Sequence, residues 1–173
     1  MVPAAAIAPT AAPPVTPAPL RATRAERWTC AVLAAAGLAV LGVAAWLDPS
    51  PDGVGTHRAL GLAPCGWMVS MNLPCPSCGM TTAFSHAAHG SFLRSAYVQP
   101  MGFVLAIGTA AGAVTCLHTA LTGSRLAHVL GSRITARALL ALGILALLAW
   151  GWKVALVRGA LPAEALHRVP ASA

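Results

Sequence analysis

The sequence predicts an all-α integral membrane protein with three transmembrane helices and a cysteine-containing, interfacial helical segment between the first and the second. Hydrophobic residues make up 57% of the 173 residues and charged residues only 9%, whereas a soluble domain carries about 25% charged residues. The mean hydropathy is +0.73. Three runs with almost no charge are each long enough to cross a bilayer. These observations exclude a water-soluble globular class.

The N-terminal residues 1–27 are predicted to be a disordered tail rich in proline and alanine. Six prolines among residues 1–20 prevent a continuous helix. The arginines follow this stretch and precede the first apolar run, which is the reverse of the order in a secretory signal peptide. The first apolar run is therefore expected to remain as an anchor. A short C-terminal tail is predicted over residues 158–173.

Three spans are predicted within a membrane domain that covers residues 28–157. Trp28 and Trp46 bracket the first span and would lie about 27 Å apart in a helix, close to the thickness of the hydrocarbon core. Pro100 begins the second span, and proline is favourable at the start of a helix. The spans are predicted at residues 28–47, 100–122 and 138–157.

The third span contains one charge, Lys153. This residue lies near the end of the run, so its amine is expected to extend toward lipid headgroups beside Trp150 and Trp152. The spans otherwise carry few polar residues, and this composition argues against a transport path.

Arginines flank the spans asymmetrically, and the positive-inside rule therefore predicts a cytoplasmic N-terminus. The chain is expected to be a multi-pass protein of the cell (plasma) membrane, with its cysteine segment outside. The net charge of +7 does not indicate nucleic-acid binding, because the arginines flank apolar runs instead of forming a patch with aromatic residues. The dominance of arginine over lysine hints at a bacterial genome. The arginines that decide the orientation are Arg21, Arg24, Arg27, Arg125, Arg133 and Arg137.

The cysteine segment, residues 60–90, holds most of the chain's cysteines. In the run CPSCG, Pro76 fixes its own φ angle and Gly79 permits a tight backbone, so the flanking sulfurs are expected to converge. The two remaining cysteines lie singly inside spans and are expected to act as small apolar side chains. The cysteines of the segment are Cys65, Cys75 and Cys78.

One use of this pattern is a metal site. Two cysteines separated by two residues and followed by glycine form the knuckle of zinc ribbons. Cys75 and Cys78 would provide the knuckle and Cys65 a third sulfur. Zinc is therefore a possible cofactor.

Histidines are the candidates for a fourth ligand. If a helix runs from near residue 75 to residue 90, Cys78 and His86 lie about 12 Å apart along its axis, which is too far for one ion. This spacing excludes His86 and His89. His57 remains a candidate, as does water.

Two other uses of the cysteines remain open. At a helix N-terminus, Cys75 would have a lowered pKa and act as the attacking thiolate of a redox pair, with Cys78 resolving. A structural disulfide would instead join Cys65 to one of these two cysteines. The residues alone do not choose between the metal, redox and disulfide interpretations.

The rest of the segment is predicted to lie along the membrane surface. Residues 80–88 form a run too short to span the bilayer. After Gly90, a second short helical run places its larger apolar residues on one side. These residues are Phe92, Leu93, Ala96 and Tyr97.

The run P-C-P-S-C-G-M-T at residues 74–81, with a cysteine some ten positions earlier and a proline-led span after it, resembles a bacterial membrane-protein family with a C-P-x-C-G-x-T motif. That family is a domain of unknown function, number 2752. The resemblance extends over roughly residues 60–155 and implies a membrane architecture without a known activity. It marks Cys65, Pro74, Cys75, Pro76, Cys78, Gly79, Thr81, Gly90 and Pro100.

Four positions depart from the family pattern. Thr82 stands where arginine is usual, Gly66 replaces a proline, Ser91 an aspartate and Gln99 an asparagine. The missing arginine argues against anion binding beside the cysteines.

The sequence therefore favours a small membrane scaffold or accessory subunit with a cysteine motif stabilised by a metal or a disulfide. Its expected partners are the lipid bilayer and another membrane protein. The alternative is a membrane thiol-disulfide oxidoreductase that uses Cys75 and Cys78. A role that is not enzymatic is favoured, because only four acidic residues occur and no Ser-His-Asp set or phosphate loop is visible.

Overall fold

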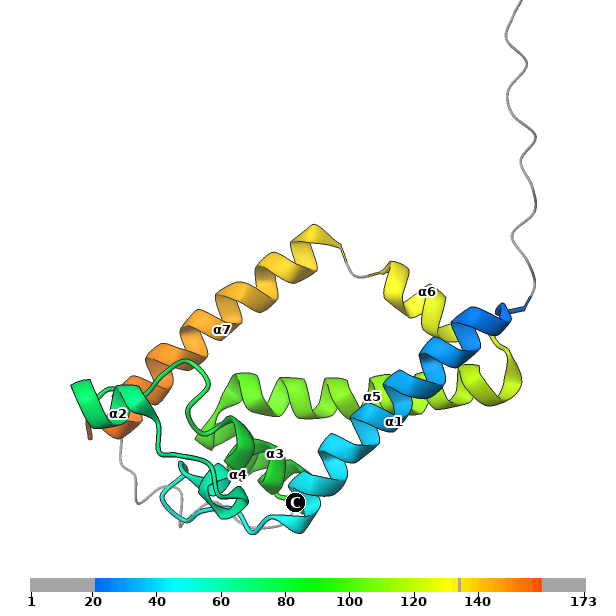
Figure 1. The fold of residues 1–173 in the computed structure, drawn as a ribbon. Helices are drawn as coiled ribbons and strands as arrows, with labels where there is room; N and C mark the ends of the chain where they lie inside the picture. The colour runs from blue at the N-terminus through cyan, green and yellow to red at the C-terminus, as the bar shows by residue number, and fades with distance from the viewer. Residues whose placement is uncertain (1–20, 134, 160–173) are drawn as a thin grey trace, which may run out of the picture.

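A computed structural model describes residues 21–133 and 135–159. Residues 1–20 of the predicted N-terminal tail and residues 160–173 of the predicted C-terminal tail lie outside the described residues. Within the described part, every regular element is helical (Figure 1). In chain order the elements are α1 (Arg24–Trp46), the 3₁₀ helix η1 (Thr56–Leu60), α2 (Gly66–Met71), α3 (Met80–Ala88), α4 (Phe92–Val98), α5 (Pro100–Thr122), α6 (Leu126–Ser132) and α7 (Ala136–Val157).

Helices α1, α5 and α7 are long and apolar enough to cross a membrane, which confirms the predicted fold class. Helix α1 begins at Arg24, earlier than the predicted span, because Thr23 and Glu26 form a reciprocal capping box. Helix α7 likewise begins before its predicted span, since the Thr135 side chain accepts the backbone N–H of Ala138.

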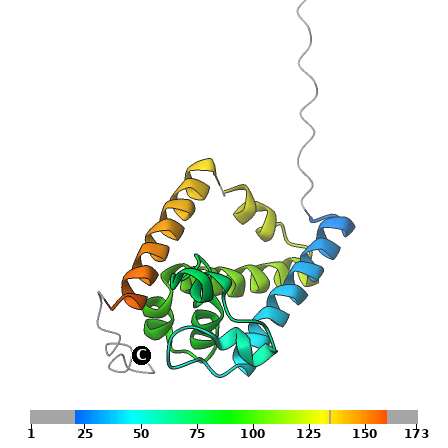
Figure 2. The same ribbon diagram turned by 60° about the vertical axis from the view of Figure 1, so that its left-hand side comes forward.

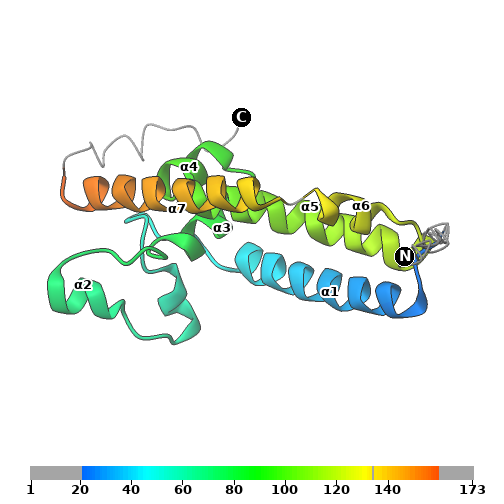
Figure 3. The ribbon, with the colours of Figure 1, turned by 90° about the horizontal axis from the view of Figure 1, so that it is seen from above.

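Helices α1 and α5 run antiparallel and side by side (Figure 3). Small residues allow their close approach: a Cβ at Gly37 would lie 3.1 Å from the Cβ of Ala113. Ala34 and Ala106 are also buried in this part of the molecule. Without a hydrophobic driving force in lipid, such close packing is what holds spans together.

The ends of this helix pair are joined by hydrogen bonds. The Arg27 guanidinium donates to the carbonyl oxygens of Ala120 at 3.0 Å and Leu121 at 3.2 Å. The Ala22 N–H donates to the carbonyl of Gly123, which caps α5. The arginine-bearing start of α1 and the end of α5 therefore share one end of the molecule, opposite the cysteine segment.

The cysteine segment and α4 fold over the other end of the helix pair. Helix α3 reaches α5 at Gly102, where an added Cβ would lie 2.8 Å from the Cβ of Ala83. Helix α4 turns Ser95 and Val98 inward and leaves Phe92 and Leu93 about half exposed. The apolar side predicted for α4 is therefore exposed only in part, because Tyr97 packs against Trp152 and Phe92 meets Phe103.

The buried interior of this end is unusually polar. The Ser95 hydroxyl donates to the carbonyl of Ala83 at 2.6 Å, and the Ser85 hydroxyl donates to the carbonyl of Leu47. Buried polar groups are tolerated when they find partners, and among the buried side-chain nitrogen and oxygen atoms of the described residues only Nε2 of His86 and Oε1 of Gln99 have none. The buried polar and charged residues of this end are Thr56, Thr82, Ser85, His86, Ser91, Ser95, Gln99 and Lys153.

Helix α7 is attached to the rest of the protein at its C-terminal end. Figures 1 and 2 show it leaving this end at an angle, so its N-terminal part lies apart from α1 and α5. Trp152 donates its indole N–H to the carbonyl of Tyr97 at 2.8 Å. The two rings also meet edge to face, with centroids 5.6 Å apart. Most large apolar side chains along the rest of α7 are exposed, as is expected of a surface that contacts lipid.

Candidate metal centre

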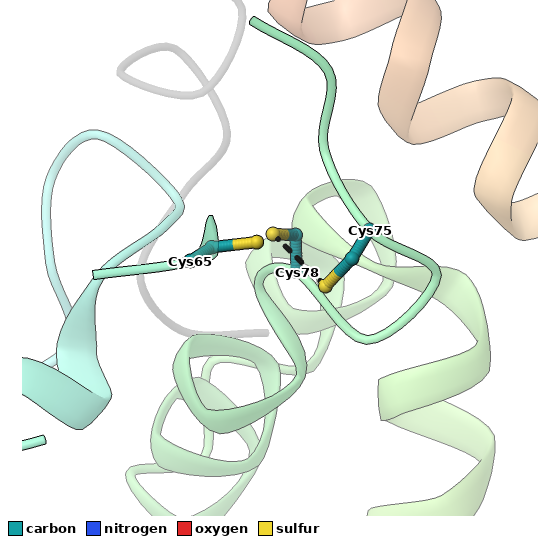
Figure 4. Close-up of side chains that lie close together, drawn as sticks. All are labelled: Cys65, Cys75 and Cys78. Carbon is teal, nitrogen blue, oxygen red and sulfur yellow. Dashed lines mark hydrogen bonds between the residues drawn. The ribbon is translucent and has the colours of Figure 1, made fainter. Parts of the chain in front are cut away.

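The structure brings together the two cysteines predicted to converge, Cys75 and Cys78, and the third sulfur that the metal interpretation assigned to Cys65. The Sγ atoms of Cys65, Cys75 and Cys78 all lie within 4.8 Å of one another, and all three are free thiols. In Figure 4 the Cys65 side chain points toward Cys78, whose sulfur lies 3.3 Å from that of Cys75. Such a group can hold a metal ion.

A tight turn presents two of the sulfurs. The Cys78 N–H donates to the carbonyl of Cys75 at 2.9 Å, and the Met80 N–H donates to the carbonyl of Ser77 at 3.0 Å. Gly79 follows with a φ of 85° and caps α3. The expectation that a helix starts near Cys75 is wrong, because a left-handed residue ends the turn and α3 begins only at Met80.

Gly79 is required for steric reasons as well. A Cβ at this position would lie 2.8 Å from the carbonyl oxygen of Gly53 and 2.8 Å from the Nζ of Lys153. Real Cβ atoms do not approach other atoms this closely. The glycine of the CPxCG motif therefore lets two other segments pack directly against the cysteine turn.

The carbonyls on both sides of Cys75 accept hydrogen bonds from side chains that are distant in the sequence. The indole N–H of Trp150 donates to the carbonyl of Pro74 at 2.9 Å, and the amide of Gln99 donates to the carbonyl of Pro76 at 3.0 Å. The two prolines of the motif thus act through their carbonyl oxygens as well as their fixed φ angles. The turn is anchored to α7 and to the residue that precedes α5.

The thiols differ in their electrostatic environments. The Met68 backbone N–H lowers the pKa of the Cys65 thiol to about 6, because a hydrogen bond to the thiolate favours the charged form. Burial raises the pKa of the Cys78 thiol to about 12. Without a bound ion, Cys65 is therefore mostly thiolate at neutral pH and Cys78 is a thiol.

A cavity of about 280 Å³ adjoins the three sulfurs. Thr81 lines both this cavity and an apolar groove between α1 and α3. The cavity is lined by Gly55, His57, Cys65, Cys75, Ser77, Cys78, Gly79, Met80, Thr81 and Thr82.

The histidines considered as a fourth ligand lie outside the sulfur group. His57 lines the cavity, but its Nε2 atom lies 3.2 Å from the carbonyl oxygen of Ala63. The Nδ1 atom of His89 is hydrogen-bonded to the carbonyl oxygen of Ser85. His86 is buried, and its Nε2 atom has no hydrogen-bond partner. The exclusion of His86 and His89 agrees with this arrangement.

Lys153 is a site residue that sequence reasoning missed. Its side chain was expected to reach lipid headgroups, yet only 3% of it is exposed. The ammonium donates to the carbonyls of Gly53 at 2.9 Å and Val98 at 3.1 Å. The expectation is wrong because the cysteine segment folds over this end of α7 and supplies carbonyl acceptors in place of water. The signal available in the sequence was that Lys153 is the chain's single lysine.

The position of Lys153 also matters for the site of Thr82, where the family pattern has an arginine. Thr82 is fully buried and its hydroxyl lies 2.8 Å from that of Thr56. A cation nevertheless lies beside the cysteine turn, since Lys153 approaches from α7.

Sequence reasoning also missed a pair of cysteines within the spans. Cys30 of α1 and Cys116 of α5, expected to be isolated, interact with each other through their thiols. Both contribute to the lining of one cavity between the two helices. The antiparallel register of α1 and α5 brings them together, and nothing in the local sequence signals it.

Comparison with known proteins gives one match. The family model described as "Protein of unknown function (DUF2752)" matches residues 65–113. No curated protein and no solved structure matches the chain. The matched residues run from Cys65 through the first half of α5. The resemblance to this family of unknown function, first suggested by the CPxCG motif, is thus confirmed for the cysteine segment and the start of the second span.

Proposed function

We propose that this chain is a membrane scaffold or accessory subunit whose external segment is fixed by a thiophilic metal ion, with zinc as the leading candidate. The observation that carries the proposal is the convergence of three sulfurs, from Cys65, Cys75 and Cys78, on one point. A disulfide would use only two of these thiols and leave the third unpaired, whereas a metal ion uses all three.

The spacing of the sulfurs supports this proposal. Thiolates bound at about 2.3 Å to a tetrahedral zinc ion lie about 3.8 Å apart. Cys75 and Cys78 lie 3.3 Å apart, and no pair of the three sulfurs is separated by more than 4.8 Å, so small side-chain rotations would satisfy the ion. Three protein ligands leave one coordination position for water or for a donor from a partner.

The membrane setting supports a scaffold role. The three candidate spans anchor the chain in lipid, and the arginine-bearing end lies opposite the cysteine segment. By the positive-inside rule, the N-terminus is cytoplasmic and the metal centre lies outside the plasma membrane. A fixed segment at that surface suits docking of another membrane protein.

Metal titration of the full chain in lipid nanodiscs tests the proposal. Cd²⁺ serves as the probe, since its thiolate complexes give an ultraviolet charge-transfer band. We expect about one ion per chain and loss of the band in Cys65→Ser, Cys75→Ser and Cys78→Ser. Cys116→Ser is the matched control, because this cysteine lies outside the group, and it should bind as the unmodified chain does. Absence of binding by the reduced, unmodified chain would overturn the proposal.

A thiol-disulfide oxidoreductase is the second candidate, favoured by the 3.3 Å approach of Cys75 and Cys78. In such a reaction the two thiols would give two electrons and two protons to a substrate disulfide, leaving a Cys75–Cys78 disulfide and two substrate thiols. The helix start that would activate Cys75 in this reaction is absent, because α3 begins only at Met80. A metal-free chain that reduces a model disulfide and loses this activity in Cys75→Ser would favour this function over the first.

A further inference from the structure

Lys153 carries a positive charge into the interior beside the cysteine turn. The residue is 3% exposed, and its ammonium donates to two backbone carbonyls, those of Gly53 and Val98. Carbonyl oxygens satisfy hydrogen bonds but do not neutralise a charge. A buried charge is costly unless an opposite charge lies nearby.

The counter-charge is not a carboxylate. Within residues 21–133 and 135–159, no acidic side chain interacts with Lys153, and the titratable group whose charge acts on its ammonium is Cys78 when that thiol ionises. The ammonium also lies against Gly79, the residue that follows Cys78. The groups that can supply negative charge next to this ammonium are therefore the sulfurs of the candidate metal centre.

The charges of the loaded site balance. Three thiolates and one divalent ion carry one net negative charge, which a single ammonium cancels. We infer that Lys153 supplies the positive charge that balances the cysteine site, an inference that rests on the proposed metal function. With a divalent thiophilic ion bound, the three thiolates, the ion and the ammonium together carry no net charge.

Metal affinities can distinguish a role of the Lys153 charge from a role of its hydrogen bonds alone. Removal of the ammonium should weaken any anionic metal–thiolate complex in proportion to its charge. The complex of three thiolates with Cd²⁺ carries one negative charge, and that with Cu⁺ carries two. Loss of the lysine should therefore weaken Cu⁺ binding more than Cd²⁺ binding, whereas loss of a hydrogen-bonding anchor should weaken both equally.

The experiment compares Cd²⁺ and Cu⁺ affinities of the full chain in nanodiscs, without oxygen and in competition with chelators of known affinity. Lys153→Gln and Lys153→Met both remove the charge but differ in hydrogen bonding. In both we expect Cd²⁺ affinity to fall about tenfold and Cu⁺ affinity to fall about a hundredfold. Lys153→Arg keeps the charge and should keep the ratio of the two affinities.

Trp152→Phe is the matched control, since it removes a hydrogen bond of the same helical turn to the carbonyl of Tyr97 without changing charge. Its affinity ratio should equal that of the unmodified chain. Equal losses for both ions in the neutral lysine variants, or no loss, would overturn the inference while leaving the metal site intact. Failure of the unmodified chain to bind either ion would instead overturn the proposed function.

Discussion

Trp150 donates its indole N–H to the carbonyl oxygen of Pro74 at 2.9 Å. The donor lies on the last span and the acceptor directly precedes the candidate ligand Cys75. This one bond links two segments that are far apart in the sequence, so the position of α7 and the shape of the cysteine turn depend on each other.

Trp150→Phe should loosen the cysteine turn. The phenyl ring retains most of the apolar contact but cannot donate a hydrogen bond, which is worth about 1 kcal/mol when buried. We expect Cd²⁺ affinity to fall about fivefold, which corresponds to that energy. Trp46→Phe is the control, because Trp46 is 74% exposed. An equal effect of the two substitutions would count against a specific role for the Trp150 bond.

Gly79→Ala should disrupt the site more than an equivalent change elsewhere. The φ of 85° costs any other residue about 1–2 kcal/mol, and the new methyl group would meet the Gly53 carbonyl and the Lys153 ammonium. Gly61→Ala separates the two effects, since Gly61 also has a positive φ but has nothing within 4 Å of an added Cβ.

The measurement for this pair is the thermal unfolding midpoint together with Cd²⁺ binding. Gly61→Ala should lower the midpoint modestly and leave binding unchanged. Gly79→Ala should lower both. A variant at Gly79 that binds Cd²⁺ normally would show that the close approach of the three segments does not matter to the site.

The metal-free chain should show distinct pH profiles of alkylation. Since the pKa of Cys65 is lowered to about 6, its thiolate fraction and its reaction rate should rise with pH through about 6 and be nearly constant above pH 7. The pKa of Cys78 is raised to about 12, so its rate should stay low and still increase above pH 9. Mass spectrometry after iodoacetamide treatment at graded pH resolves the two. Identical profiles would contradict the assigned environments.

The spans were predictable from the sequence because their signal is local. Length, apolar composition and flanking residues are all read along one stretch, and only the helix starts shifted, where Thr23 and Thr135 cap earlier than the apolar runs begin. The convergence of the cysteines was predictable for a similar reason, since proline and glycine shape the turn that contains two of them.

The rest of the site depended on contacts between distant segments. Trp150 and Lys153 meet the cysteine turn only because α7 returns to the same end as α3 and α4, and no local pattern encodes that return. The start of α3 was misplaced because Gly79 competes with the helix-initiating tendency of Pro76. Because Gly79 adopts a left-handed conformation, the residues before it form a separate turn and α3 begins only after it, at Met80.

The sidedness predicted from the positions of the arginines can be measured directly. In spheroplasts, a membrane-impermeant maleimide should label Cys65 and should not label a cysteine placed on α6 by His128→Cys. Each is tested in a chain whose other cysteines are changed to serine. The reverse labelling pattern would place the metal centre in the cytoplasm and reverse the proposed topology.

Ser95→Ala should destabilise the end of the molecule that carries the cysteines. The Ser95 hydroxyl is fully buried and donates to the carbonyl of Ala83 at 2.6 Å, so its loss should cost about 1–2 kcal/mol. Ser70→Ala removes a similar bond, to the carbonyl of Gly66, at an exposed position and should cost little. The two thermal midpoints measured in the same detergent make the comparison, and equal values would contradict a stabilising polar interior.

The hydroxyl pair of Thr56 and Thr82 illustrates what a polar interior implies for mutational tolerance. Along the lipid-facing surfaces of the spans, leucine, valine and alanine can replace one another, because lipid accepts any apolar shape. Between Gly53 and Gln99, the buried hydroxyls of Thr56, Thr82 and Ser95 each have a partner at hydrogen-bond distance. Substitutions around the cysteine turn, such as threonine in place of the family's arginine at position 82, should therefore be accompanied by changes in the partner group, whereas those on the lipid-facing surfaces should occur independently of one another.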